Sequence, residues 1–142
     1  SQNQVFAAAY HGRVKAVSRR DGSPQWEQDI STYLDLARGY SQIYVVDEDD
    51  IITAIDENSG EVVWTQESFA RRKLSAPIAF SNYLVVADEQ GYVHIIAQRD
   101  GRLLGRRKLD GKGIRNNMVV ADSTIFVLGN SGSLHALEVE RR

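Results

Sequence analysis

Short runs of apolar residues recur along the chain at a nearly fixed interval. The runs that begin at Val5, Ile43, Leu84 and Ile125 are separated by 38, 41 and 41 residues. A period of about 40 residues is typical of repeat architectures, and it constrains the fold more strongly than local propensities do. We therefore divide the chain into four copies of one structural unit, at residues 1–30, 31–68, 69–109 and 110–142.

Turn residues keep the same register as the apolar runs. Gly12, Asp50, Gly91 and Gly132 follow the first run of each unit, again at spacings of 38, 41 and 41 residues. Tight turns rich in Gly, Asn and Asp join neighbouring antiparallel strands. We expect such turns at Tyr10-His11-Gly12, Glu89-Gln90-Gly91 and Asn130-Ser131-Gly132.

Each complete unit accounts for four strands. Continuous apolar runs such as 43–46 and 93–97 predict strands that are covered on both faces. A shorter strand precedes the first run in three units. Four antiparallel strands in every repeat of this length predict an all-β fold, a β-propeller, with one four-stranded blade for each unit. The short strands are predicted at Leu36-Ala37, Pro77-Ile78-Ala79 and Met118-Val119-Val120.

The strand count is not a whole number of blades. The first unit lacks its first strand and the last unit lacks its fourth, so we expect fourteen strands, or about three and a half blades. Propellers close with about four to eight blades, and an open blade face would expose apolar surface. We expect residues 1–142 to be a partial β-propeller, with Ser1 at an internal break and Arg142 at a genuine C-terminus. An N-terminal segment of the complete protein would supply the missing outer strand.

Two tryptophans stand at the same position of successive units. Trp26 and Trp64 are predicted to pack between blades, with each indole N–H bonded to a turn carbonyl. The third unit has Gly105 at this position. The Asp-Gly and Ser-Gly pairs at 21–22, 59–60 and 100–101 are predicted turns in which glycine adopts a positive φ. We assign all of these residues to folding.

Composition narrows the class of function. The 142 residues contain 17 Lys and Arg and 19 Asp and Glu, for a net charge of −2, so no basic excess favours nucleic acid. The chain has no cysteine, which excludes disulfides, thiolate metal sites and cysteine nucleophiles. No stretch approaches the roughly 18 to 20 apolar residues of a membrane-spanning helix.

Two histidines are candidate metal ligands. His94 and His135 occupy equivalent positions of successive units, where imidazoles on adjacent blades would be available to a metal ion. The other two units have Lys15 and Thr53 at this position. We therefore interpret the position as part of a solvated strand face.

Other motifs also have simple structural interpretations. Residues 47–50 are all acidic, and residues 56–60 begin like a calcium loop. The glycine spacing and the ligand series of a calcium loop are missing from both segments. We therefore predict that both are hairpin turns. Gly111-Lys112-Gly113 lacks the spacing of a phosphate-binding loop and is predicted to be a loop ahead of the next strand. The chain has no Gly-x-Ser-x-Gly elbow. We predict no catalytic, cofactor-binding or metal-binding residue, and no cofactor.

Two short basic runs leave two interpretations open. Arg71-Arg72-Lys73 and Arg106-Arg107-Lys108 stand out in a slightly acidic chain. They are either a solvated loop and a solvated strand edge, or a surface that recognises carboxylates on a partner.

The segment from Ala54 to Trp64 resembles the Ala-x-Asp-x-x-(Thr/Ser)-Gly-x-x-x-Trp repeat of quinoprotein-like propellers. The order of units, through Leu74-Ser75-Ala76-Pro77 to Asp100-Gly101-Arg102, is similar to the C-terminal half of the BamB family. This resemblance implies an eight-bladed ring in a lipoprotein of the outer-membrane β-barrel assembly machinery, tethered to the periplasmic face of the outer membrane of Gram-negative bacteria. The lipidated cysteine of the family is absent from this chain.

The resemblance also implies partners. They are BamA, bound through its POTRA domains, and unfolded outer-membrane proteins. Contacts to BamA are attributed to earlier blades that nothing in this chain matches, so the partner-binding residues stay unknown. The implied function is a non-catalytic scaffold rather than an enzyme. The alternatives are a fragment of a quinone-cofactor-dependent dehydrogenase and a cytosolic adaptor propeller, whose Gly-His and Trp-Asp signatures are absent.

Overall fold

The computed structural model describes residues 4–8, 12–32, 34–114, 118–121 and 124–138. Within these residues the chain forms fourteen strands. The expected turn at Tyr10 and His11, and both ends of the chain, lie outside the described residues. The strands are Gln4–Ala8 (β1), Val14–Ser18 (β2), Pro24–Gln28 (β3), Ala37–Gly39 (β4), Gln42–Val46 (β5), Ile52–Asp56 (β6), Val62–Gln66 (β7), Ile78–Phe80 (β8), Tyr83–Ala87 (β9), Tyr92–Ala97 (β10), Leu103–Lys108 (β11), Met118–Ala121 (β12), Thr124–Leu128 (β13) and Leu134–Leu137 (β14).

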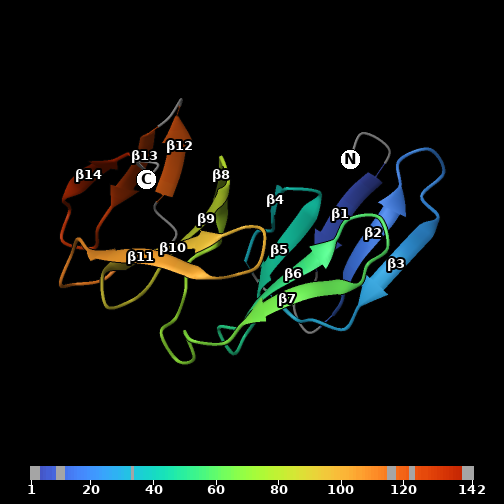
Figure 1. The fold of residues 1–142 in the computed structure, drawn as a ribbon, viewed down its shortest axis with the longest axis horizontal. Coiled ribbons are helices and arrows are strands. Elements are labelled where there is room, and N and C mark those ends of the chain that lie inside the picture. Colours follow the sequence, from blue (N-terminus) through green and yellow to red (C-terminus); the bar gives the residue numbers. More distant parts are fainter. Residues whose placement is uncertain (1–3, 9–11, 33, 115–117, 122–123, 139–142) are drawn as a thin grey trace.

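The strands form four separate antiparallel sheets. Their orders are β1-β2-β3, β4-β5-β6-β7, β8-β9-β10-β11 and β12-β13-β14, so each sheet is a simple meander. Figure 1 shows the sheets side by side, and the innermost strands β4, β8 and β12 are the elements that contact each other from sheet to sheet. This radial arrangement of meanders is that of successive propeller blades, and it confirms the predicted all-β propeller fold. We refer to the sheets as blades 1 to 4 in chain order.

Three apolar clusters fill the spaces between the blades. Blades 2 and 3 enclose the largest cluster, to which Tyr44, Val46 and Ile52 contribute from one side and Leu84 and Ile96 from the other. Similar clusters lie between blades 1 and 2 and between blades 3 and 4. All five residues of β5 are buried, as its continuous apolar run predicts.

Each tryptophan connects its own blade to the next one. The Trp26 indole N–H donates to the carbonyl of Glu57 at 2.9 Å, and that of Trp64 donates to the carbonyl of Gln98 at 2.8 Å. Both acceptors lie in or next to the turn before the outer strand of the following blade. The predicted packing and hydrogen bonding of both side chains are confirmed.

Glycine is required in the turn beneath each indole. Gly60 and Gly101 have φ values of +76° and +77°. A Cβ atom at Gly60 would lie 2.5 Å from the Trp26 ring, and one at Gly101 would lie 2.4 Å from the Trp64 ring. The turn therefore needs glycine both for its conformation and for the close approach of the ring.

Candidate functional site: a pocket on the loop face

One end of the blades is covered by two kinds of loop. The connections between blades, 67–77 and 109–114, meet the hairpin turns 47–51, 88–91 and 129–132. The amide of Glu89 donates to the Arg72 carbonyl at 3.1 Å, and the amide of Asn130 donates to the Gly113 carbonyl at 2.9 Å. We call this end the loop face.

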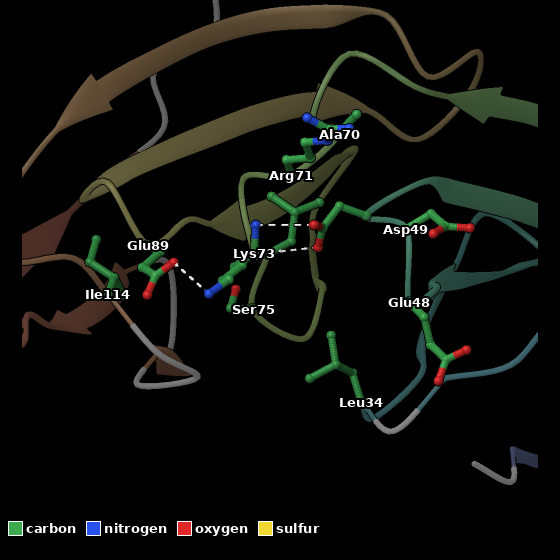
Figure 2. Close-up of a pocket in the computed structure, with 11 residues that line it drawn as sticks. Leu34, Glu48, Asp49, Ala70, Arg71, Lys73, Ser75, Glu89 and Ile114 are labelled. Carbon is green, nitrogen blue, oxygen red and sulfur yellow. Dashed lines mark hydrogen bonds and ion pairs between the residues drawn. The ribbon is translucent and has the colours of Figure 1, made fainter. Parts of the chain in front are cut away.

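A pocket of about 650 Å³ opens on the loop face between blades 2 and 3. Figure 2 shows Glu48 and Asp49 along one side of the pocket, and Lys73 and Glu89 on the other. Leu34 and Ile114 add apolar surface from the connections on either side. The lining residues are Leu34, Glu48, Asp49, Asp50, Ala70, Arg71, Lys73, Leu74, Ser75, Glu89 and Ile114.

Three lining residues other than glycine hold a left-handed backbone. The φ values are +62° at Asp50, +65° at Arg71 and +55° at Lys73. The Asp50 carboxylate accepts hydrogen bonds from the amides of Lys73 and Leu74 at 3.1 and 2.9 Å. A left-handed conformation is costly for most residues and persists where the surroundings fix it. Here Asp50 holds the connection that forms one wall of the pocket.

The charges of the pocket are arranged as two opposing walls. Glu48 and Asp49 belong to the turn between β5 and β6, whereas Arg71 and Lys73 belong to the connection between β7 and β8. The Lys73 Nζ lies 3.4 Å from an oxygen of Glu89. A pocket with charged walls of both signs and apolar surface between them suits a protein side chain better than a small ion.

A buried polar cluster supports the same connection from below. Asp88 is fully buried, and its Oδ2 lies 2.7 Å from Nε2 of His94 and 3.0 Å from a guanidinium nitrogen of Arg72. A carboxylate only accepts hydrogen bonds, so Nε2 of His94 carries the proton. Phe69 packs on the His94 ring, with centroids 4.6 Å apart. The cluster fixes the start of the connection to blade 3.

Both titratable groups of this cluster have lowered pKa values. Burial acts to raise the pKa of Asp88, but hydrogen bonds from His94, the Tyr92 amide and Arg72 outweigh it and lower that pKa below 3.8. Desolvation by burial lowers the pKa of His94 below 6.5, against the attraction of Asp88. Asp88 is therefore charged and His94 neutral at pH 7.

The interpretation of His94 as part of a solvated strand face is wrong. Its exposed fraction is only 4%, because Phe69 and the connection behind it cover the strand at this point. His135, the equivalent residue of blade 4, is half-buried. In the part of the chain that the structure describes, no group of three or more His, Cys, Asp or Glu side chains lies close enough to hold a metal ion.

The two basic runs have different surroundings. Arg72 is not part of a solvated loop, since it pairs with the buried Asp88; its neighbours Arg71 and Lys73 are exposed at the pocket. Arg106, Arg107 and Lys108 lie on β11, where all six residues are exposed. The second run therefore lies on a solvated outer strand, which is compatible with both interpretations of that run.

The remaining motifs form the predicted turns and loops. The Asp47 carboxylate accepts from the amides of Asp49 and Ile51, and the Asp56 carboxylate accepts from the amides of Asn58 and Ser59. Both acidic segments are hairpin turns, as predicted. Residues 111–113 belong to the loop ahead of β12.

Comparison with known proteins identifies the family. A family model described as outer membrane protein assembly factor BamB matches residues 1–66. The BamB of Pseudomonas aeruginosa is 35% identical over 139 residues, which are 98% of this chain and 37% of that protein. Over its length, the chain belongs to the BamB family. The BamB of Escherichia coli K12 is 32% identical over 133 residues, covering 94% of this chain and 34% of that protein.

A solved BamB structure has the same fold. The crystal structure of BamB from Moraxella catarrhalis superposes with a TM-score of 0.91 and 19% identity, covering 100% of this chain and 43% of that chain. The chain thus spans little more than a third of the length of the BamB relatives it matches. The BamB resemblance noted in the sequence is confirmed. No helix within the described residues has the length and apolar character to cross a membrane.

The pocket is the feature that the sequence did not predict. Its walls depend on a left-handed backbone at residues such as Arg71 and Lys73. A left-handed conformation is usually predicted from a glycine in the sequence, and neither residue is glycine. A hint was available in Asp50, which stands where the three other units have the turn glycines Gly12, Gly91 and Gly132. A polar residue in a left-handed turn position often uses its side chain to hold a neighbouring segment.

Proposed function

We propose that this chain is part of a non-catalytic scaffold subunit of the β-barrel assembly machinery. In this role it assists the folding and insertion of outer-membrane proteins by binding the POTRA domains of BamA. It works at the periplasmic face of the outer membrane. A lipid anchor outside this chain tethers the complete protein there. Unfolded outer-membrane proteins are a second partner. The observation that carries the proposal is similarity to proteins named outer membrane protein assembly factor BamB along 94 to 98% of the chain.

The pocket on the loop face is the contact site that the geometry favours. Ala70 and Leu74 give it apolar surface, and charges of both signs surround that surface. Interface hot spots commonly consist of one large partner side chain in such a pocket, enclosed by a polar rim. A folded partner domain that presents one apolar side chain between charged neighbours fits this arrangement.

The alternative, a fragment of a quinone-cofactor-dependent dehydrogenase, receives less support. Such an enzyme needs calcium ligands that converge on a central cofactor and usually a vicinal cysteine pair. The chain contains no cysteine, and its described part holds no group of three metal-ligating side chains. The relatives it matches carry the name of an assembly factor.

Calorimetry between the complete gene product and purified POTRA domains tests the proposal, with the 142-residue chain measured alongside. We expect saturable binding by the complete product. Ala70→Trp fills the pocket from an exposed position, and we expect it to weaken binding at least tenfold. Arg20→Trp places the same side chain on the exposed turn between β2 and β3 and serves as the control.

The outcomes separate the two parts of the proposal. Absence of binding by the complete product contradicts the scaffold function, and a search for a bound quinone becomes the next step. Undiminished binding by the Ala70→Trp protein contradicts the assignment of the pocket and moves the contact to earlier blades.

A further inference from the structure

The outer strand of blade 3 concentrates positive charge in a chain that is acidic overall. Residues 99–108, which include β11, hold five of the 17 Lys and Arg and only one of the 19 Asp and Glu. All six residues of β11 are exposed. β11 forms the lower rim of blade 3 in Figure 1, and its only strand partner among the described residues is β10.

Comparison with the outer strands of blades 1 and 2 shows that neither has this positive charge. Arg106 stands where β3 has Glu27 and β7 has Thr65, and Lys108 stands where the other two units have acidic residues. In blade 1 the charge of Glu27 is neutralised by Arg13 at 2.8 Å. None of the salt bridges between described residues includes Arg106 or Lys108.

The cations converge on one aromatic ring instead. Arg106 faces His94 and Lys108 faces Tyr92 across the pair of β10 and β11. The guanidinium carbon of Arg106 lies 5.0 Å from the Tyr92 ring centroid, the Lys108 Nζ 5.7 Å and the guanidinium carbon of Arg72 5.7 Å. We call Arg72, Tyr92, Arg106 and Lys108 the Tyr92 cluster.

The Tyr92 cluster carries more positive charge than its surroundings offset. Of its three cations, Arg72 is neutralised by the buried Asp88. His94, which faces Arg106 across the strand pair, supplies no negative charge that could offset it. A tyrosine ring attracts a cation only weakly at an exposed site, so Arg106 and Lys108 remain available to an external anion.

We propose that β11 and the Tyr92 cluster bind the phosphate groups of anionic phospholipids at a membrane surface. Arginine forms paired hydrogen bonds with a phosphate group, and the two cations of Arg106 and Lys108 beside one ring suit a compact oxyanion. Leu103 and Leu104, with exposed fractions of 47% and 45%, place apolar side chains beside these cations. Basic residues next to exposed leucines are typical of surfaces that rest on an anionic bilayer.

Blade 2 provides an internal comparison within the same fold. Val62 and Val63 are exposed to 48% and 47%, like the leucines of β11, but Glu61 and Glu67 flank them in place of basic residues. Apolar exposure is therefore a property of the repeat, while the positive charge belongs to blade 3. The inference depends on one part of the proposed function, the location of the protein beside a membrane.

Sedimentation with lipid vesicles tests the inference on the complete gene product, expressed without any lipid modification. We expect binding to vesicles of equal parts phosphatidylglycerol and phosphatidylcholine, and little binding to phosphatidylcholine alone. Arg106→Thr with Lys108→Glu installs the residues that blade 2 has at these positions. Each basic side chain near an anionic bilayer strengthens binding about fivefold, so this double variant should bind at least about 25-fold more weakly.

Two further variants separate a local site from general electrostatics. Arg20→Thr with Arg19→Glu makes the same change in formal charge in the exposed turn between β2 and β3, and we expect its binding to stay within about twofold of the unmodified protein. Arg106→Lys with Lys108→Arg retains the charge and should retain binding. Thermal unfolding confirms that each variant is folded, and the substitutions lie on an exposed edge strand.

Four outcomes would overturn the inference. The first is equal binding of the protein to both kinds of vesicle, and the second is an equal loss of vesicle binding in the two charge-changing variants. The third is saturable binding of inorganic phosphate at the Tyr92 cluster by a protein that does not bind vesicles. The fourth is binding of a polyglutamate peptide by a protein that does not bind vesicles. The POTRA calorimetry is independent of these results. Loss of vesicle binding with intact POTRA binding contradicts only the lipid site, whereas the reverse result contradicts only the scaffold proposal.

Discussion

At the scale of single residues, the contact between one tryptophan and one glycine sets the geometry between blades. The indole of Trp64 lies on Gly101 and donates to the Gln98 carbonyl, so one side chain fixes both the spacing and the register of blades 2 and 3. Trp26 and Gly60 repeat the arrangement between blades 1 and 2. The same chemistry therefore occurs twice in one chain, which allows it to be tested twice.

A double-mutant cycle measures the energy of this contact. Trp64→Ala should lower the free energy of unfolding by about 3 kcal/mol, because it opens a cavity and removes a hydrogen bond. Gly101→Ala should cost about 2 kcal/mol in the unmodified protein and about 1 kcal/mol in the Trp64→Ala background, where only the left-handed backbone strain remains. Chemical denaturation gives all four values. Additive effects would contradict a direct contact, and the pair Trp26 and Gly60 serves as the independent repeat.

The neutral state of His94 predicts a pH dependence of stability. A histidine whose pKa is lower in the folded state than in the unfolded state takes up its proton more readily on unfolding, so stability falls as the pH drops below about 6.5. Asp88, with its own lowered pKa, adds a further loss only below about pH 4. His94→Gln can still donate to Asp88 but does not titrate, so its unfolding free energy should be flatter between pH 7 and 5. An unchanged slope would contradict the neutral assignment, and a His135→Gln protein is the control.

At the scale of secondary-structure elements, the connection between β7 and β8 is held in place by side chains of neighbouring segments. The connection after β7 is held by Asp50 at one point and by the cluster of Asp88, His94 and Arg72 at another. The pocket on the loop face therefore has a wall of fixed shape. A preformed pocket lowers the cost of ordering when a partner binds.

Replacing Asp50 tests how far this wall depends on one side chain. Asp50→Gly installs the residue that the repeat has at Gly91 and Gly132 and relieves the left-handed strain, but it removes two hydrogen bonds to the connection. We expect a net loss of about 1 to 2 kcal/mol in unfolding free energy, and faster amide hydrogen exchange at Leu74. Asp49→Asn removes a neighbouring charge without touching the connection. Equal exchange rates at Leu74 in both variants would contradict the tethering role.

The sequence predicted the strands well and the connections poorly, for a physical reason. Equivalent strand positions such as Ile43 and Leu84 pack against the same kind of neighbour, so the repeat period is enough to predict their environment. The environment of His94 depends instead on Phe69, which lies in a connection that no other unit matches. Periodicity cannot predict a contact that occurs only once. The pocket, whose walls also come from such segments, was missed for the same reason.

At the scale of the whole molecule, the blades form one continuous stack. Each apolar cluster is shared by two blades, so no described sheet encloses a core by itself. We expect the blades to unfold together, because loss of one blade exposes the apolar face of its neighbour. Tryptophan fluorescence and far-ultraviolet circular dichroism should give coincident denaturation curves for the complete gene product. A Trp26→Ala protein should shift both curves equally, and separated transitions would contradict a single cooperative unit.

The tryptophan contacts also set the order in which the blades fold during synthesis. Trp26 finds its hydrogen-bond acceptor 31 residues later in the chain, and Trp64 finds its acceptor 34 residues later. During translation or secretion, each indole therefore stays uncovered until the greater part of the following blade has emerged. Blades 1 and 2 therefore complete their packing only when the next blade is present, so their assembly proceeds in one direction with a delay of one repeat.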